Sequence, residues 1–375
     1  MRNISILLIF VMLFTTTVFA VEEDAPVPLE VYADAAVLME PKTGEILYSK
    51  NEHERLSPAS VTKIMTILLI AEQIESGAIS LYDPVTAGPN AAQMGGSQVY
   101  LEEGESMTVE EMLKCIVIAS ANDCAVAMAE HISGTESAFV DRMNKRAAEL
   151  AMEDTHFVNC TGLTDSDDHY SSAYDIALMT KEVLRYDWLK QYTTLWTDSI
   201  RGGAFGLTNT NKLVRYYEGT IGMKTGFTQK AMYCLSAAAE RDGDQFIAVV
   251  LHAPNSADRF ADAQAMLNYA FANYTVYSPS ANVVIPPVRI RLGETDSIQP
   301  NFPGASDMIS AKEKQLSCRC ELPKELPAPV EEGAQIGTLL IQDGDQTVRE
   351  IPITSPESVP RIALSALWLH LLGSL

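Results

Sequence analysis

Apolar residues in the first 275 positions form strand-like runs near both ends and helical repeats between them. The runs at residues 35–39 and 45–48 are split by a Pro-Lys-Thr-Gly turn, a pattern typical of a β-hairpin. Strand-like runs return at residues 232–238 and 245–251, on either side of an Asp-Gly turn. Helical spacing predicts helices over residues 58–75, 108–120, 122–132, 136–152, 173–184 and 259–274.

This order of elements decides the fold class. Strands from both ends of the domain, with helices in the middle, indicate an α+β fold in which helices surround an antiparallel sheet, rather than repeated βαβ units. After residue 276, apolar and charged residues alternate, as in Val288-Arg289-Ile290-Arg291, between Pro-rich turns. We therefore expect a larger domain over residues 21–275 and a small all-β domain over residues 276–355.

The two ends of the chain carry apolar segments of different kinds. Residues 1–20 combine a positive charge at Arg2, an apolar run and a final Val18-Phe19-Ala20, which predicts a signal peptide and an exported protein. No second apolar stretch reaches the roughly 20 residues needed to cross a bilayer. The segment 356–375 is apolar without one clean polar face, and we expect it to associate with the outer leaflet of the cytoplasmic membrane. The alternative is a terminal helix docked on the protein itself.

Charge excludes some partners. The 375 residues carry a formal net charge of −22, which becomes −23 once Arg2 leaves with the leader, because residues 1–20 contain no acidic side chain. Nucleic acid and anionic membrane surfaces are therefore poor partners for the body of the protein. An apolar content of 47% is ample for a buried core, so a globular protein is expected.

Cysteine and histidine spacing predicts neither a disulfide framework nor a metal site. Cys318 and Cys320 would share one face of a strand without being placed to pair, and Cys115 and Cys124 would fall on opposite faces of a helix. Most of the six cysteines are therefore expected to be buried free thiols. The six histidines show no recognisable ligand spacing, so no metal ion is predicted, and nothing implies an organic cofactor.

Candidate chemistry lies in the stretch LSPASVTKIMT, where Ser60 and Lys63 stand three residues apart. In a helix with Ser57 as N-cap and Pro58 at its first position, both side chains leave one face within hydrogen-bond reach. This places a nucleophile beside a possible base. The Ser60 N–H falls among the donors that a helix leaves unpaired and can help hold a developing oxyanion. A lone S-x-x-K also occurs by chance in many helices, so the interpretation depends on what accompanies it.

Two further motifs follow in order, Ser120-Ala121-Asn122 and Lys224-Thr225-Gly226. S-x-x-K, S-D-N and K-T-G form the signature of penicillin-binding proteins and class A β-lactamases, here with Ala121 in place of Asp. With its flanks PASVTKIMT, SANDCAVAMAEHISG, HFVNCTGLTD, LTNTNKLV and GMKTGFT, the chain resembles the low-molecular-mass penicillin-binding proteins that are D-alanyl-D-alanine carboxypeptidases. The resemblance covers roughly residues 33–271, and the later β-rich part is similar to that family's second domain.

The resemblance implies catalytic roles for four residues. Ser60 is expected to be the nucleophile, and neutral Lys63 to take its proton. Burial and the like charge of Lys224 are both expected to lower the Lys63 pKa. Ser120 and Asn122 resemble the family residues that hydrogen-bond this lysine and pass a proton to the leaving amine.

Substrate-binding roles follow on the opposite wall. Lys224-Thr225-Gly226 is expected on a strand edge, where the missing Cβ of Gly226 lets a substrate backbone come close. By resemblance, the N–H of Phe227 joins that of Ser60 as the oxyanion hole. Thr225 and Arg259 match the positions with which this family recognises a free carboxylate.

The predicted enzyme is a serine-type D-Ala-D-Ala carboxypeptidase that trims peptidoglycan stem peptides through an acyl-enzyme, at the extracytoplasmic face of the cell membrane or in the cell wall. No E-x-x-L-N motif lies between the second and third motifs, so β-lactam antibiotics are expected to acylate the protein and stay on it. The alternatives are transpeptidation or β-lactam hydrolysis on the same fold, and a catalytically silent wall-binding or sensing protein.

Overall fold

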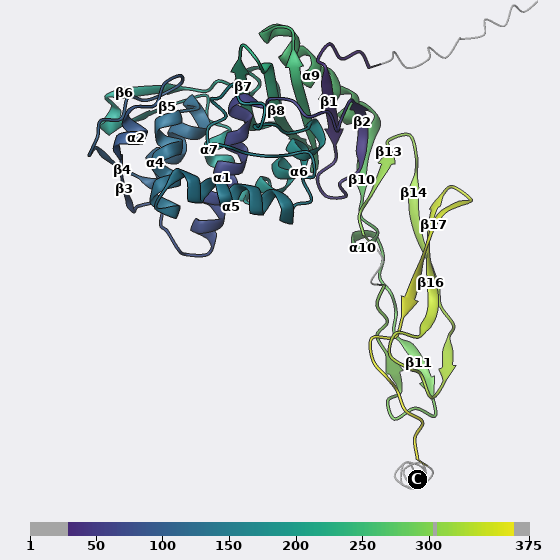
Figure 1. Cartoon of the computed structure of the whole chain (residues 1–375). Coiled ribbons are helices and arrows are strands. Elements are labelled where there is room, and N and C mark those ends of the chain that lie inside the picture. The colour runs from purple at the N-terminus through teal and green to yellow at the C-terminus, as the bar shows by residue number, and fades with distance from the viewer. Residues whose placement is uncertain (1–28, 303–305, 364–375) are drawn as a thin grey trace, which may run out of the picture.

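The computed structural model describes residues 29–302 and 306–363 of the chain. The predicted signal peptide and most of the predicted membrane-associated segment lie outside the described residues. Figure 1 shows a larger lobe built from the N-terminal part of the chain and an elongated β-rich part that extends away from it.

The larger lobe is organised around one antiparallel sheet with the strand order β2-β1-β9-β8-β7. Its strands are β1 (Ala35–Met39), β2 (Ile46–Lys50), β7 (Thr220–Thr228), β8 (Met232–Arg241) and β9 (Asp244–Ala253). Because β1 lies between β2 and β9, the N-terminal hairpin is joined to strands from the far end of the domain. This confirms the predicted α+β fold. β7 forms one edge of the sheet.

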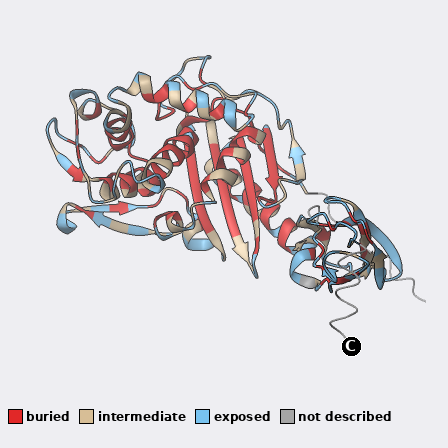
Figure 2. Cartoon of the chain, turned by 90° about the horizontal axis from the view of Figure 1, so that it is seen from below, coloured by how far each residue is buried: buried red, intermediate tan, exposed pale blue. Residues whose placement is uncertain are grey.

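Helices cover both faces of this sheet and give the lobe two apolar cores. On one face, α9 (Ser256–Asn273) packs on β8 and β9. On the other face, α6 (Ala173–Val183) packs on β1 and β9, and α1 (Lys63–Glu75) packs on α6. Figure 2 shows the central strands buried between these layers. The α1 helix is buried from Lys63 to Ala71, which fits its continuous apolar run better than an amphipathic stripe.

Further helices and two small sheets complete the larger lobe. Its helices are α2 (Pro89–Ala92), α3 (Val109–Lys114), α4 (Asn122–Ser133), α5 (Glu136–Glu149), α7 (Lys190–Thr193) and α8 (Leu213–Tyr216). Two small sheets pair β3 (Pro84–Thr86) with β4 (Ser106–Thr108), and β5 (Thr197–Ile200) with β6 (Phe205–Thr208). Side-chain caps begin four of the lobe's helices: Thr108 forms a capping box with Glu111, and Thr135, Ser172 and Asn255 accept from backbone N–H groups.

The β-rich part follows α9 directly. Its elements are β10 (Tyr274–Tyr277), α10 (Pro279–Asn282), β11 (Val288–Arg291), β12 (Ser297–Ile298), β13 (Met308–Ala311), β14 (Leu316–Glu321), β15 (Glu325–Pro327), β16 (Gln335–Asp343) and β17 (Gln346–Thr354). They form a β10-β13 pair and two three-stranded sheets, β12-β11-β15 and β14-β16-β17. Alternating buried residues such as Leu339 and Ile341 on β16 fill a small separate core.

The β-rich part ends later than the predicted boundary at residue 355. Val359 is 1% exposed and exchanges two backbone hydrogen bonds with Val330, at 3.0 and 2.7 Å. The Ile362 N–H donates to the Leu292 carbonyl oxygen at 2.9 Å. Residues 356–362 therefore belong to this part, because the apolar Val359 side chain is buried in its core. Across residues 29–302 and 306–363, no helix has both the length and the apolar character that a membrane crossing requires.

Two predicted helices are interrupted where the candidate motifs lie. A 3-10 turn, η1 (Ala59–Thr62), begins at Ala59, whose backbone φ is +47°. The α-helix begins only at Lys63. Ser57 therefore does not act as the predicted N-cap. The helix predicted over residues 108–120 ends at Lys114, passes through a π turn, η2 (Cys115–Ala119), and stops at Ser120 with a φ of +61°. At both places tertiary contacts override the local helical pattern.

The break at Ser120 also corrects the prediction that Cys115 and Cys124 lie on opposite faces of a helix. The two thiols instead lie close together: burial raises the pKa of Cys124 well above its ordinary value, and the neighbouring Cys115 thiol raises it further. The six cysteines are free thiols, and Cys115, Cys124, Cys160 and Cys234 are buried.

A turn at Gly162 docks closely against η1. Gly162 has a φ of +75°, and a Cβ there would lie 1.8 Å from the Ala59 carbonyl oxygen and 2.7 Å from Thr62 Oγ1. Gly77, just after α1, has a similar φ of +72° but open space around it. The two glycines therefore separate the effect of backbone strain from the effect of close docking.

We expect Gly162→Ala to lower the free energy of unfolding far more than Gly77→Ala. The change at Gly77 adds only left-handed backbone strain, about 1 kcal/mol. The change at Gly162 also forces apart two packed backbone segments, for about 3 kcal/mol or more. Urea unfolding followed by circular dichroism measures both losses, and equal losses would contradict the close docking of this turn.

Candidate active site

Ser60 and Lys63 meet on the short turn that leads into α1. Lys63 Nζ donates to Ser60 Oγ at 3.0 Å. Lys63 is completely buried, whereas Ser60 remains partly accessible. A 3-10 turn eclipses side chains three residues apart, so the two groups meet although the α-helix has not yet begun. The arrangement places a hydroxyl and an amine in the relation that nucleophile and general base require.

Lys63 is held from a second side by the turn at residues 159–163. Its Nζ also donates to the backbone oxygen of Thr161 at 2.9 Å. Asn159 shapes this turn, because its Oδ1 accepts from the N–H groups of Thr161 and Gly162 at 3.1 and 2.7 Å. With one N–H fixed by a carbonyl, the lone pair of a neutral Lys63 can be aimed at the serine hydroxyl.

His169 supports the same turn from behind. It is 1% exposed, and burial lowers its pKa to about 4, so the ring is neutral. Its Nδ1 accepts from the Val158 N–H at 3.1 Å, which leaves the proton on Nε2. That proton is donated to Thr62 Oγ1, 2.8 Å away, beside Lys63. His169 thus fixes the position of η1 rather than carrying charge.

The burial of two lysines sets the charge of the site. Burial lowers the pKa of Lys63 to about 7, although Cys160 and Asp123 nearby act in the opposite direction. Burial also lowers the pKa of Lys224 well below its ordinary value, and the charges of Lys63 and Arg259 lower it further. The like-charge effect predicted on Lys63 therefore falls on Lys224. Burial alone makes a neutral Lys63 available near neutral pH.

The second motif is presented by the break between η2 and α4. Asn122 Nδ2 donates to the Gly95 carbonyl oxygen at 2.8 Å, which leaves Oδ1 as a free acceptor. Within the described part of the chain, neither Asn122 Oδ1 nor the buried Ser120 Oγ has a hydrogen-bond partner. Buried polar atoms without partners are rare, and two of them only two positions apart in the sequence indicate a place where a ligand supplies the missing bonds.

The β7 strand forms the opposite wall at the sheet edge. Lys224 Nζ donates to the Thr225 backbone oxygen at 3.1 Å, and both side chains are buried. Thr225 Oγ1 donates to Thr210 Oγ1 at 2.7 Å. Gly226 approaches η1 so closely that a Cβ there would lie 3.1 Å from the Ser60 nitrogen. We predicted a glycine at position 226 to let a substrate approach, but the packing of β7 on η1 already requires a residue without a Cβ there.

Phe227 and Arg259 border the third motif. Phe227 is 52% exposed, and its ring stacks on Tyr233 with 4.5 Å between centroids. From α9, Arg259 Nη1 donates to the backbone oxygens of Gly226 and Cys234 at 3.0 and 3.2 Å. Burial lowers the pKa of Arg259 to about 10, and its Nε is buried without a partner among the residues described. Arg259 therefore braces the strand that carries Lys224-Thr225-Gly226.

Most of the predicted site residues meet through contacts that the structure shows. Ser60 and Lys63 share a hydrogen bond, and Gly226 packs on the Ser60 turn. The charges of Lys63 and Arg259 add to burial in lowering the pKa of Lys224. Asn122 lies near the same turn, because a Cβ placed on Gly96 would touch both Asn122 Nδ2 and the Leu163 side chain. Sequence reasoning missed the bond from Lys63 to the Thr161 carbonyl and the way the Asn159 side chain supports the turn. The spacing Asn-x-x-Gly, typical of a side-chain-supported turn, was the available signal for both.

Comparisons with known proteins identify the family of this chain. The profile of a family described as D-alanyl-D-alanine carboxypeptidase matches residues 19–255. The chain belongs to the D-alanyl-D-alanine carboxypeptidase family. A second profile, described as the C-terminal domain of penicillin-binding protein 5, matches residues 303–361. The predicted family, the serine carboxypeptidase class and the function in cell-wall peptidoglycan are thereby confirmed.

Two of the relatives cover most of the chain, and a third covers less of it. The D-alanyl-D-alanine carboxypeptidase DacF of Bacillus subtilis (strain 168) is 40% identical over 370 residues, 96% of this chain and 95% of that protein. Penicillin binding protein 5 from Haemophilus influenzae superposes with a TM-score of 0.77 at 28% identity, over 90% of this chain and 100% of that one. Penicillin-binding protein D2 from Listeria monocytogenes, in its ampicillin-bound form, superposes with a TM-score of 0.60 at 28% identity, over 65% and 99%.

We expect the rate constant for acylation by a fluorescent penicillin to rise with pH through about 7. Only a neutral Lys63 can accept the Ser60 proton, and burial lowers its pKa to about 7. The neutral fraction, and with it the rate, should therefore increase roughly tenfold between about pH 6 and about pH 8. Time-resolved labelling measures this profile. Lys63→Arg, which stays charged, should remain inactive throughout, and a flat wild-type profile would exclude Lys63 as the base.

Proposed function

We propose that Ser60, activated by Lys63, removes the terminal D-alanine from peptidoglycan stem peptides that end in D-Ala-D-Ala. Ser60 Oγ attacks the carbonyl carbon between the two D-alanines while its proton passes to neutral Lys63. The N–H groups of Ser60 and Phe227 stabilise the oxyanion. The terminal D-alanine then leaves as a protonated amine, and an ester joins Ser60 to the shortened peptide. The observation that carries this proposal is the 3.0 Å hydrogen bond from a fully buried Lys63 to Ser60.

In this reaction Ser120 transfers a proton and Asn122 binds the substrate backbone. The unpartnered Ser120 hydroxyl can relay a proton from Lys63 to the departing nitrogen, which otherwise would leave as an unstable anion. The unpartnered Asn122 Oδ1 can accept from a substrate backbone N–H. Both roles use the atoms for which the described residues supply no hydrogen bond.

The β7 strand aligns the substrate. An edge strand can pair with an extended peptide, and Lys224, Thr225 and Arg259 give that edge amine, hydroxyl and guanidinium donors. A free carboxylate on the leaving D-alanine matches this chemistry, which selects the end of a peptide rather than its interior. The substrate's other end must then run past Phe227 toward the end of the strand.

Water completes the cycle by hydrolysing the ester, and a β-lactam blocks this step. The ampicillin-bound state of the Listeria relative supports covalent inhibition of this chain as well. Glu136 is the acidic side chain that touches the turn at residues 159–163, but its Oε1 accepts from the Cys160 N–H and thiol at 3.1 and 3.2 Å. It is thereby engaged in holding the turn. Slow release of penicillin, rather than β-lactamase turnover, follows.

A fluorescent penicillin should label the wild-type protein, and Ser60→Ala should abolish the label. Mass spectrometry of a synthetic pentapeptide ending in D-Ala-D-Ala should show loss of one D-alanine without a cross-linked product. A protein that labels but only joins peptides would be a transpeptidase. A protein that neither labels nor trims would be the silent wall-binding alternative, and both outcomes would refute the proposed reaction.

We also propose that the protein acts outside the cytoplasm and is held at the membrane by its C-terminal segment. The support is the apolar leader, the apolar sequence after residue 362, and the direction in which the β-rich part extends. In Figure 1, β11 lies at the end of this part farthest from the larger lobe, and Ile362 bonds to Leu292 next to β11. The β-rich part would then set the catalytic lobe at a distance from the bilayer.

Removing residues 364–375 should release the mature protein from lipid vesicles, while penicillin labelling stays at the wild-type rate. The truncation leaves Val359 and Ile362 in place, so the β-rich core is preserved. Vesicle sedimentation measures the bound fraction. Continued binding of the truncated protein would show that this segment is not the anchor.

A further inference from the structure

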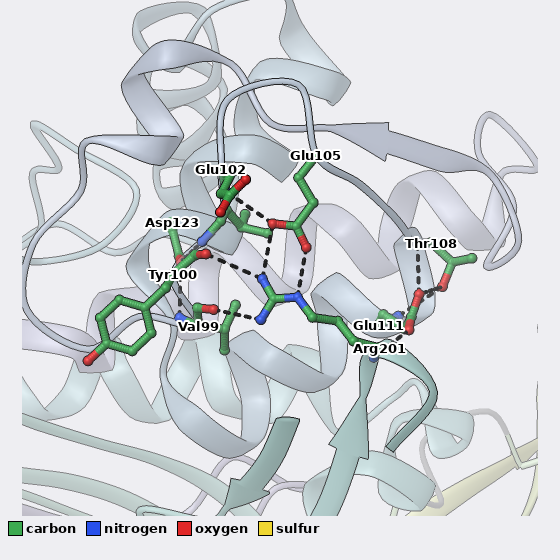
Figure 3. A network of polar contacts seen from close by, with 9 residues as sticks. Val99, Tyr100, Glu102, Glu105, Thr108, Glu111, Asp123 and Arg201 are labelled. Carbon is green, nitrogen blue, oxygen red and sulfur yellow. Dashed lines mark hydrogen bonds and ion pairs between the residues drawn. The ribbon is translucent and has the colours of Figure 1, made fainter. Parts of the chain in front are cut away.

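A polar network beside the candidate site holds the loop that orients Asn122 (Figure 3). This loop, residues 95–105, connects α2 to β4. It contacts Asn122 twice: the Asn122 N–H donates to the Ser97 carbonyl oxygen at 2.7 Å, and Nδ2 donates to the Gly95 carbonyl oxygen at 2.8 Å. The Ser97 carbonyl holds the Asn122 backbone, and the Gly95 carbonyl binds Nδ2 and so decides which way Oδ1 faces.

Asp123 fixes the middle of the loop. This carboxylate is 1% exposed, and its Oδ2 accepts from the N–H groups of Val99 and Leu101 at 3.0 and 3.1 Å. Its Oδ1 accepts from the Cys124 N–H at 2.9 Å. A buried carboxylate needs such charge-assisted bonds, so the loop cannot move without leaving Asp123 unsatisfied. Asp123 thus holds in place the 95–105 loop, and this loop in turn orients Asn122.

Arg201 closes the network from the connection between β5 and β6. Its Nε and Nη2 form a bidentate pair with Glu105 at 2.7 and 3.1 Å, and its Nη1 donates to the Val99 carbonyl oxygen at 2.9 Å. Figure 3 shows the guanidinium between these two parts of the loop. The backbone of Arg201 has a φ of +55°, which a non-glycine residue adopts only when its surroundings impose it.

We propose that Arg201 is a positioning residue for Asn122, acting through Val99, Asp123 and the 95–105 loop; this inference rests on the proposed catalytic role of Asn122. Without Arg201, Glu105 becomes a partly buried unpaired carboxylate and the Val99 carbonyl loses a charged donor. The loop then relaxes, and Asn122 loses the carbonyls that orient it. Misplacement of a reacting group by about 1 Å can cost about a hundredfold in rate.

The alternative is that Arg201 only stabilises the lobe, and a matched control separates the two. Arg146 on α5 pairs with Glu72 at 2.7 Å, and these side chains are 22% and 23% exposed, close to the 26% and 23% of Arg201 and Glu105. Arg146 contacts none of the candidate site residues in the described structure. Its loss should therefore cost stability without touching the chemistry.

We expect Arg201→Ala to lower the rate constant for penicillin acylation at least about tenfold, with full labelling at long times. Arg201→Lys should lose nearly as much, because an ammonium cannot form the bidentate pair. Arg146→Ala should leave the rate within about twofold of wild type. An unchanged rate in Arg201→Ala would overturn the proposal, and so would an equal loss in Arg146→Ala. If Arg201→Ala does not fold, Glu105→Gln tests the same bond.

A double-mutant cycle tests whether Arg201 acts through Asn122. If it does, Arg201→Ala should not lower the rate further in an Asn122→Ala background, whereas independent effects would multiply. Hydrogen exchange of the 95–105 backbone should also quicken in Arg201→Ala and not in Arg146→Ala. Multiplying effects or unchanged exchange would overturn the proposal. Labelling that survives Ser60→Ala would instead refute the proposed function, whichever result Arg201 gives.

Discussion

The exclusion of water from one lysine amine is the condition on which the proposed active site depends. Lys63 lies wholly inside the lobe, and burial rather than a neighbouring charge lowers its pKa to about 7. An exposed lysine would stay protonated and could not accept the serine proton. The packing of η1, the turn at residues 159–163 and the edge of β7 therefore has a chemical purpose beyond stability, because each of them covers part of this amine or its partner.

Two glycines let three chain segments converge on the nucleophile. Gly162 brings the turn with the Thr161 carbonyl onto η1 from one side, and Gly226 brings β7 onto η1 from the other. In both cases a single added carbon would meet backbone atoms that have no alternative position. The position of Ser60 is thus set by contacts from the helical layer and from the sheet together.

The sequence predicted those elements whose side chains bury a continuous face and those residues that stand in recognisable motifs. The sheet with strands from both ends, the helices α1, α4, α5, α6 and α9, and the residues of the three motifs were all expected. The start of α1 at Lys63 and the break at Ser120 were not, because the local pattern there is helical and distant contacts decide the backbone. Asp123 and Arg201 gave no signal either. An acid in a first helical turn and an arginine before two glycines look ordinary, and the bonds that give them a role join residues 22 to 102 positions apart.

The place of β1 in the middle of the sheet has a consequence for the order of assembly. A chain that emerges from a translocation pore with its N-terminus first presents the β1-β2 hairpin and the serine turn long before β9 and β7 follow. An isolated two-stranded hairpin is marginally stable in water, and pairing over such a sequence separation is slow. A chain that has not yet released β7 and β9 therefore carries Ser60 without the sheet edge that packs on its turn, and that packing forms only when the later strands have followed.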